Sequence, residues 1–255
     1  MPFAYPLFLS LEGQHCLVAG LGEVGVRKLH GLLAGGVGSV LALESPLPQG
    51  APETPPCPEA APLLADARVR FARRACTAGD VRESLLVFAA TGDPEENARI
   101  ARLCRAERVL CNCASAPRLG QFAVPAVARC GELCAALSTG GGSPALARRL
   151  RGELEDWLSP WAALTHFLGL LRPLVLAMGN DTRHNRELFR KVAASPLGHW
   201  LAAGDAARCR DWLYAELPPA LAAMAGPLVG ACARTPEPQT GGAPTVPDGE
   251  PHGCC

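Results

Sequence analysis

Residues 15–28, HCLVAGLGEVGVRK, carry the clearest indication of the fold class. It opens with a short apolar run, and residues 23–34 then place apolar side chains at helical spacing. Between the two, Gly20, Gly22 and Gly25 stand in the spacing G-x-G-x-x-G. A strand, a tight glycine turn and a helix in this order are typical of the first crossover in a parallel sheet.

The three glycines predict a dinucleotide site. The first glycine permits the tight turn, the second lets the backbone approach a pyrophosphate, and the third lets helix and strand pack closely. The pyrophosphate would lie at the helix N-terminus. Glu44 follows the next strand, 19 residues after Gly25, where an acid can accept hydrogen bonds from ribose hydroxyls. This favours NAD over NADP, although an exposed loop acid explains Glu44 equally well.

The first half of the chain alternates between strands and helices. Apolar runs predict four more strands. A helix is also predicted, and a proline in its first turn is consistent with a helix start. The predicted strands are 39–43, 69–72, 85–91 and 109–113, and the helix is 94–107. The fold class is therefore α/β, with a Rossmann-like parallel sheet in residues 1–113. Residues 46–62 are so rich in proline that we expect neither a helix nor a central strand there.

The pattern changes after Ala114. Two strands, 123–128 and 132–138, and an amphipathic helix in 140–158 predict a small α+β domain, which we place at 114–158. Helical spacing, broken at Pro173 among other prolines, continues as a C-terminal helical domain, 159–233. The last residues, 234–255, lack periodicity and are expected to be disordered.

Composition excludes several classes of protein. The 24 Lys and Arg residues balance 24 Asp and Glu residues, which argues against a partner held by bulk charge, such as nucleic acid or a membrane surface. The N-terminus lacks the features of a signal peptide, so we expect a cytoplasmic protein. The apolar residues 161–178 include Arg172 and Pro173, which favours a buried or dimer-facing helix over a membrane span.

The 12 cysteines are spread along the chain and are expected to be reduced thiols. Cys111 and Cys113 lie one residue apart on a predicted strand, and Cys104 lies on the helix before it. Metal sites prefer closer loop spacings such as C-x-x-C. We therefore predict packed thiols and no metal site, and the same holds for Cys130 and Cys134.

Four segments together resemble the precorrin-2 dehydrogenase/sirohydrochlorin ferrochelatase family, the dehydrogenase module of siroheme synthase. They are YPLFLSLEGQHCLVAGLGEVGVRK, LVFAATGDPEEN, CNCASAP and ALSTGGGSPALARRLR, in family order. The resemblance implies a homodimer whose middle domain makes the dimer contact. It also implies oxidation of precorrin-2 to sirohydrochlorin with NAD as hydride acceptor, in siroheme biosynthesis.

The resemblance also implies the site residues. Those expected to hold the cofactor are Gly20, Gly22, Glu23, Val24, Gly25, Glu44, Ser45 and Thr91. The substrate carries carboxylates, for which a glycine turn, a helix start and nearby arginines offer donors. The candidates for substrate binding are Ser138, Thr139, Gly140, Gly141, Ser143 and Arg148. The catalytic candidates are Ser115 and Asn112.

Ser115 departs from the family pattern, which usually has an aspartate three residues after the asparagine. That aspartate is thought to act as a general base in both dehydrogenation and chelation. A serine hydroxyl accepts no proton at neutral pH without a neighbouring base. We therefore predict a dehydrogenase with weak or absent chelatase activity, with a separate chelatase completing siroheme or the product diverted to another tetrapyrrole.

Two alternatives remain open. The first is a carrier or redox sensor that binds the tetrapyrrole or NAD without catalysis. The second is an unrelated NAD-dependent oxidoreductase, which is disfavoured because the sequence shows no Tyr-x-x-x-Lys pair after the dinucleotide segment.

Overall fold

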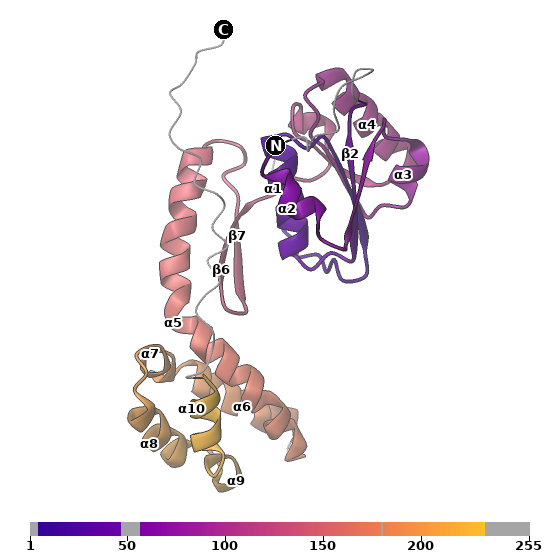
Figure 1. Ribbon diagram of the computed structural model, residues 1–255. Helices are drawn as coiled ribbons and strands as arrows, with labels where there is room; N and C mark the ends of the chain where they lie inside the picture. The colour runs from indigo at the N-terminus through magenta and orange to yellow at the C-terminus, as the bar shows by residue number, and fades with distance from the viewer. Residues whose placement is uncertain (1–4, 47–56, 180, 233–255) are drawn as a thin grey trace. The chain divides into compact units, whose positions relative to one another are not determined.

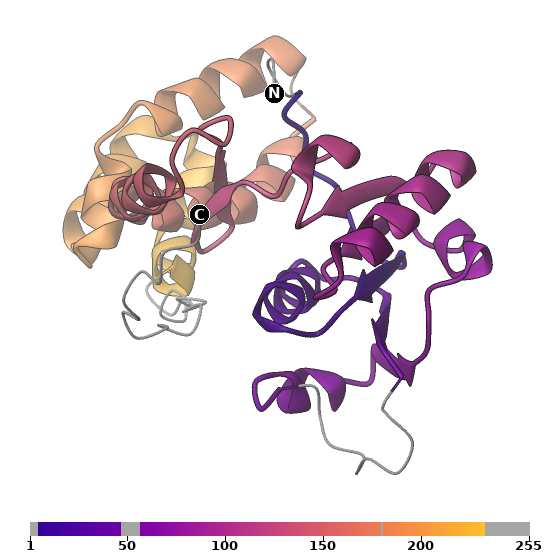
Figure 2. The same ribbon diagram turned by 90° about the horizontal axis from the view of Figure 1, so that it is seen from above.

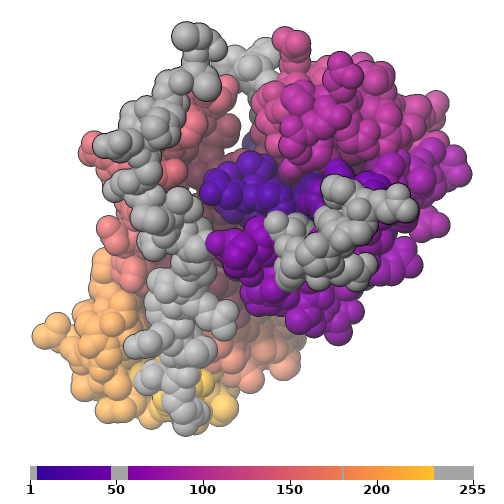
Figure 3. Space-filling view, turned by 45° about the horizontal axis from the view of Figure 1, so that its top comes forward, coloured from indigo at the N-terminus to yellow at the C-terminus, as the bar shows by residue number. Residues whose placement is uncertain are grey.

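The computed structural model describes residues 5–46, 57–179 and 181–232. It divides into two compact units, Met1–Val124 and Pro125–Cys255. The predicted disordered tail, 234–255, lies outside the described residues, as do the prolines between 47 and 56. Each unit is taken in turn below, and the space-filling view shows the first one, indigo to magenta, as a continuous packed body (Figure 3).

The first unit is built on a five-stranded sheet in the order β3-β2-β1-β4-β5. Every neighbouring pair in it is parallel. The strands are β1 (His15–Ala19), β2 (Ser39–Glu44), β3 (Val69–Arg73), β4 (Leu86–Ala89) and β5 (Leu110–Cys113). The chain runs from β1 to β2 and β3 on one side of β1, and the connection after β3 then crosses over to β4 and β5 on the other side. The carboxyl ends of β1 and β4 therefore form a topological switch point. The predicted α/β fold class is confirmed.

Helices cover both faces of this sheet (Figures 1 and 2). On one face, α1 (Glu23–Ala34) and α2 (Ala60–Leu64) pack on alternate strand residues such as Val18 and Val40. On the other, α3 (Ala78–Arg82) and α4 (Pro94–Glu107) pack on the intervening residues, such as Leu17 and Leu41. Because both faces are covered, β1 and β4 are apolar almost throughout, as expected of central parallel strands.

One expectation about the proline-rich excursion was wrong. Helix α2 begins at Ala60 and includes Pro62, although residues 46–62 were expected to form no helix. Pro62 lies in the first turn, where its missing N–H would have had no partner inside the helix. The rule against proline in helices therefore does not apply at this position.

The second unit begins with an antiparallel hairpin. Strands β6 (Ala126–Cys130) and β7 (Leu133–Leu137) pair around the turn at Gly131, whose φ is +55°. The hairpin packs on the long helix α5 (Pro144–Ala177) through a small apolar cluster centred on Ala128, Cys130 and Leu158. A two-stranded hairpin is marginal alone, so this helix supplies the surface that stabilises it.

Helix α5 is continuous through Pro160 and Pro173, so the predicted break at Pro173 was wrong. Beyond Pro160, Leu164, Phe167 and Leu171 are buried in the core of the helical region, and their packing outweighs the hydrogen bonds that the prolines remove. The other helices of this core are α6 (Thr182–Ala193), α7 (Leu197–Ala202), α8 (Ala206–Glu216), α9 (Pro219–Ala222) and α10 (Ala225–Cys232). The helix crosses the boundary predicted at 158, and the division into 114–158 and 159–233 remains a prediction.

In the described part of the chain, α5 is the one helix long and apolar enough to cross a membrane. Its mean hydropathy over the most apolar window is 1.2, and 22% of that window is buried in the protein. A single helix of this kind is weak evidence for a membrane span, because helices in protein cores pass the same criterion.

Candidate functional site

The glycine turn after β1 is tightly packed at two of its three glycines. Gly20 has a φ of +89°, and a Cβ there would lie 2.4 Å from the carbonyl oxygen of Ala90. A Cβ at Gly25 would lie 1.8 Å from the carbonyl oxygen of Gly20. The first glycine therefore allows the turn to pass close to β4, and the third brings α1 against the turn, as the sequence predicts.

The second glycine faces open space. A Cβ at Gly22 would have no atom of the described chain within 4 Å. Gly22 is also the N-cap of α1, and within the described residues no side chain caps this helix. The N–H groups of its first turn are thus left for another partner, and Glu23 and Val24 belong to that turn. The open space and the uncapped helix start fit the pyrophosphate of a dinucleotide.

Glu44, at the end of β2, lies beside this turn. Its Oε2 accepts a hydrogen bond from the backbone N–H of Leu21 at 2.8 Å, and its Oε1 accepts one from Ser45 at 2.8 Å. These two bonds hold the carboxylate against the glycine turn while lone pairs remain for a ligand. An acid in this position suits ribose hydroxyls and opposes a 2′-phosphate.

The ends of β4 and β5 are joined by a residue that the sequence analysis missed. Asn97 on α4 is fully buried, and its side chain bonds to Thr91, after β4, and to Ser115, after β5. Thr91 and Ser115 were predicted site residues, and the structure brings them together through this amide. The segment TGDPEEN contains the signal, since an asparagine in the first turns of a helix after a strand end can reach back to that strand.

Asn112 and the neighbouring thiols have structural contacts. The side-chain N–H2 of Asn112 donates to the carbonyl oxygen of Phe122 at 3.0 Å, so a catalytic role for it remains a prediction. Cys104, Cys111 and Cys113 are buried, as expected of packed thiols. The hydrogen bond with Cys111 and burial raise the pKa of Cys104, which keeps that thiol protonated. Among the described residues no group of three metal-ligating side chains occurs.

The predicted substrate residues lie in the second unit, around the turn before α5. Gly140 and Gly141 have φ values of +64° and +86°. Most polar groups here have partners: Gly140 N–H donates to Ser138 Oγ, Gly142 N–H to the Thr139 carbonyl, and Leu146 N–H to Ser143 Oγ. Fewer backbone donors are left for an anion than the sequence suggested.

The arginines of α5 differ in their partners. Arg149 bonds to Glu153 at 2.9 Å, and Arg151 lies 3.6 Å from Glu155. Arg148 is exposed and has no ion-pair partner among the residues that the structure describes. Arg148 is therefore the cation of this helix start best able to meet a ligand carboxylate.

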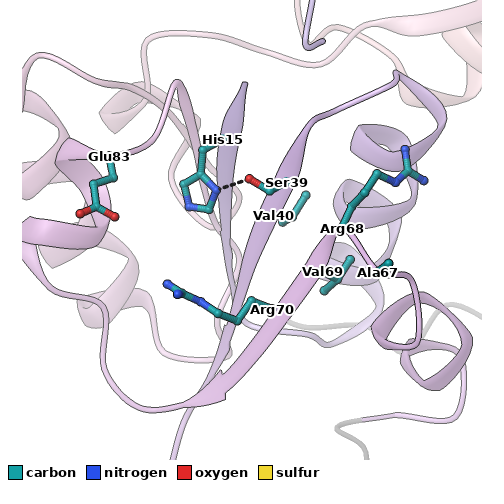
Figure 4. A pocket seen from close by; sticks show the side chains of 8 residues that line it. All are labelled: His15, Ser39, Val40, Ala67, Arg68, Val69, Arg70 and Glu83. Atoms are coloured by element: carbon teal, nitrogen blue, oxygen red, sulfur yellow. Dashed lines mark hydrogen bonds between the residues drawn. The ribbon is translucent and has the colours of Figure 1, made fainter. Parts of the chain in front are cut away.

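A pocket lies at the opposite, amino edge of the sheet (Figure 4). His15 and Ser39, which begin β1 and β2, form a 2.8 Å hydrogen bond there, and Arg70 and Glu83 line the same hollow. Burial, followed by the positive charge of Arg70, lowers the pKa of His15, so its ring stays neutral at neutral pH. Ligands of doubly wound sheets bind at the carboxyl edge, so this pocket is separate from the dinucleotide site.

Comparison with known proteins agrees with this geometry. Residues 7–126 match the family described as "Putative NAD(P)-binding". The chain is 31% identical over 229 residues to the siroheme synthase of Pseudomonas entomophila, covering 89% of this chain and 47% of that protein. It is 31% identical over 207 residues to the siroheme synthase of Thioalkalivibrio sulfidiphilus, covering 80% and 40%. The predicted family resemblance is confirmed.

A solved structure gives the same fold. "SirC, precorrin-2 dehydrogenase" superposes with a TM-score of 0.59 at 23% identity, covering 76% of this chain and 91% of that one. At this identity the likeness concerns the fold alone. The chain spans about half the length, 47%, of the first siroheme synthase that it matches. The match to an NAD(P)-binding family supports the predicted nicotinamide cofactor.

Proposed function

We propose that this protein is an NAD-dependent dehydrogenase that oxidises precorrin-2 to sirohydrochlorin in siroheme biosynthesis. The observation that carries the proposal is the uncapped start of α1 beside Glu44, at the carboxyl edge of the sheet. The similarity to siroheme synthases over 89% of the chain supplies the substrate class. The relevant chemistry of bound NAD⁺ is acceptance of a hydride.

The residues of the chain would bind and orient the two reactants. The first turn of α1 would hold the pyrophosphate, and Glu44 would accept hydrogen bonds from the adenosine ribose. We assign the rest of the cofactor contacts to Ser45 and Thr91. For the substrate we propose Arg148 and the turn from Ser138 to Ser143, although the internal bonds of that turn leave fewer donors.

The negative charge of Glu44 favours NAD over NADP. Both carboxylate oxygens already accept a backbone N–H, so the side chain is fixed where a 2′-phosphate would approach. A Glu44→Gln variant keeps an acceptor and removes the charge. We expect the preference for NAD over NADP to fall by about tenfold in this variant, measured as the ratio of the two dissociation constants.

We further propose that chelatase activity is weak or absent. Ser115 stands where the family usually has an aspartate, and a neutral hydroxyl accepts the pyrrole protons poorly. Loss of a hydride depends mainly on alignment, so dehydrogenation survives this change. A separate chelatase would then insert its second substrate, a metal ion, into sirohydrochlorin.

Turnover of precorrin-2 by the purified protein under anaerobic conditions tests both parts. We expect NADH and sirohydrochlorin to form with NAD⁺, and little metal insertion on later addition of Co²⁺. A Ser115→Asp variant should gain metal insertion and keep dehydrogenation. Tight binding of sirohydrochlorin without NADH formation would contradict the proposed dehydrogenase and favour a non-catalytic carrier. Efficient metal insertion by the natural sequence would contradict the proposed lack of chelatase activity.

The protein is proposed to act as a cytoplasmic homodimer. The hairpin β6–β7 is a sheet of two strands, and α5 exposes Leu146 and Trp157, with 47% and 62% of their surfaces accessible. Exposed apolar side chains next to a short sheet suit contact with a second copy. Sedimentation of the purified protein tests this, and a monomer at micromolar concentration would contradict it.

A further inference from the structure

We infer that Asn97 is a positioning residue that fixes the hydroxyl of Ser115 as a hydrogen-bond donor toward bound substrate. The inference rests on the proposed function and adds to it the direction of one hydrogen bond. It starts from the side chain of Asn97, which is 0% exposed and lies on α4 between the ends of β4 and β5. A buried amide is costly unless all its polar positions are satisfied.

The side chain of Asn97 uses its full hydrogen-bonding capacity. Its Oδ1 accepts from the backbone N–H of Thr91 at 2.9 Å and from Thr91 Oγ1 at 2.8 Å. Its Nδ2 donates to the carbonyl oxygen of Thr91 at 3.0 Å and to Ser115 Oγ at 3.1 Å. An amide has two donors and an oxygen with two lone pairs, so no position is left over.

The backbone of Thr91 determines which way the amide faces. A backbone N–H can only donate and a carbonyl oxygen can only accept. The atom of Asn97 that meets the Thr91 N–H must therefore be Oδ1, and the atom that meets the Thr91 carbonyl must be Nδ2. Turning the amide over would break both bonds. The group facing Ser115 is consequently an N–H, and Ser115 accepts.

This arrangement sets what Ser115 can do. Its oxygen already accepts a hydrogen bond from Asn97, which lowers the basicity of the hydroxyl, while its own hydrogen is not used on Asn97. The other neighbour is Cys113 Sγ at 3.9 Å, and sulfur is a weak acceptor. Ser115 is exposed, so a carboxylate oxygen of the substrate can take this hydrogen. The hydroxyl is thus set to donate to an acidic substrate, and it is poorly set to accept a proton from it.

A double-mutant cycle in precorrin-2 oxidation tests the inference. We expect Ser115→Ala to raise KM for precorrin-2 by about tenfold, the value of one hydrogen bond, with a smaller change in kcat. Asn97→Ala should raise KM when Ser115 is present and have no further effect on KM when position 115 is alanine. Equal effects of Asn97→Ala in the two backgrounds would show a merely structural role and overturn the inference.

A second readout needs no turnover. In Ser115→Asp, the N–H of Asn97 should donate to the new carboxylate and lower its pKa, by about one unit relative to the double variant with Asn97→Ala. The infrared carboxylate band, followed against pH, measures this difference. An unchanged pKa would overturn the inference, even if the protein proves to be a carrier. Conversely, a lowered pKa without any precorrin-2 oxidation would overturn the proposed function alone.

Removing the amide could also impair folding, because Thr91 would lose three bonds. Thermal unfolding and NAD binding are therefore measured for each variant. If Asn97→Ala does not fold, the isosteric Asn97→Asp removes both N–H donors of the amide, to Thr91 and to Ser115, without opening a cavity. The same directions are expected: a raised KM only in the Ser115 background, and a higher pKa for the aspartate at position 115. The opposite results would overturn the inference here too.

Discussion

Two glycine-rich turns in this protein each lead into a helix, and they differ in whether a side chain caps the helix N-terminus. The turn before α1 is packed against the sheet at Gly20 and Gly25, and no side chain of the described chain caps the helix at Gly22. The turn before α5 has open space around Gly140 and Gly141, and there the side chain of Ser143 caps the helix.

The difference separates two uses of glycine. In the first turn glycine is required by close approach of the backbone, and the helix N-terminus stays available for an anion. In the second turn glycine is required by the positive φ of Gly140 and Gly141. Hydrogen bonds within that turn, such as the one from Gly140 N–H to Ser138 Oγ, leave fewer donors for a ligand. A helix start that is left uncapped therefore offers more backbone donors to an anion than one capped by a side chain of its own turn.

The largest effect is expected for Gly25→Ala. The new Cβ would lie 1.8 Å from the carbonyl oxygen of Gly20, a backbone atom that cannot move without shifting the turn. We expect the free energy of unfolding to fall by about 3 kcal/mol or more. Urea unfolding measures this change. An unchanged midpoint would show that close packing is not the reason for glycine at position 25.

Gly22→Ala is the matched control for Gly25→Ala, and it is expected to affect NAD binding. No described atom lies within 4 Å of the new Cβ, so the free energy of unfolding should change by less than about 0.5 kcal/mol. The methyl group would instead occupy the space assigned to the pyrophosphate. We expect the dissociation constant for NAD to rise about tenfold or more, measured by calorimetry. Unaltered affinity would place the cofactor elsewhere.

Gly141→Ala addresses the second turn. Its φ of +86° strains any residue with a Cβ, although the surrounding space is open. We expect a loss of about 1–2 kcal/mol in the free energy of unfolding, less than for Gly25→Ala. NAD affinity should stay unchanged. A weaker affinity for NAD in this variant would contradict the separation of the two turns.

The smallest effect is expected at the N-terminus of α3, which is capped by side chains. Asp80 accepts from Thr77 in a capping box and pairs with Arg74, and the hydrogen bond from Arg74 holds its pKa below the usual range. Because the pKa is lower in the folded state, its contribution is complete above about pH 4 and is lost as the pH falls through the folded value. Asp80→Asn should cost about 1 kcal/mol at neutral pH and less in acid. Unfolding measured against pH checks this; a constant difference would contradict it.

Local signals in the sequence predicted the first unit well. Continuous apolar runs such as the one at β4 and the G-x-G-x-x-G spacing reflect burial and backbone contact within a few residues. The continuity of α5 through Pro173 could not be predicted, because it depends on Phe167 and Leu171 packing against helices that follow much later. Tertiary packing outweighs local propensity there.

The candidate site shows the same limit. Glu44 was found because its distance from the glycine turn follows from one strand and one helix. Asn97 was missed because its importance lies in reaching Ser115, 18 positions away, across the ends of two strands. Only the pairing of β4 with β5 brings these residues together. The sequence signal is a polar residue at helical spacing from apolar ones, as Asn97 is from Ile100, Ala101 and Cys104.

The buried thiols offer a built-in record of how each unit opens. All ten described cysteines are free. Six lie in the first unit, Cys16, Cys57, Cys76, Cys104, Cys111 and Cys113, and four lie in the second, Cys130, Cys134, Cys209 and Cys232. Eight of these ten are buried and shielded from an alkylating reagent in the native state. Their order of modification would therefore reveal which unit opens first, without any cysteine having to be introduced.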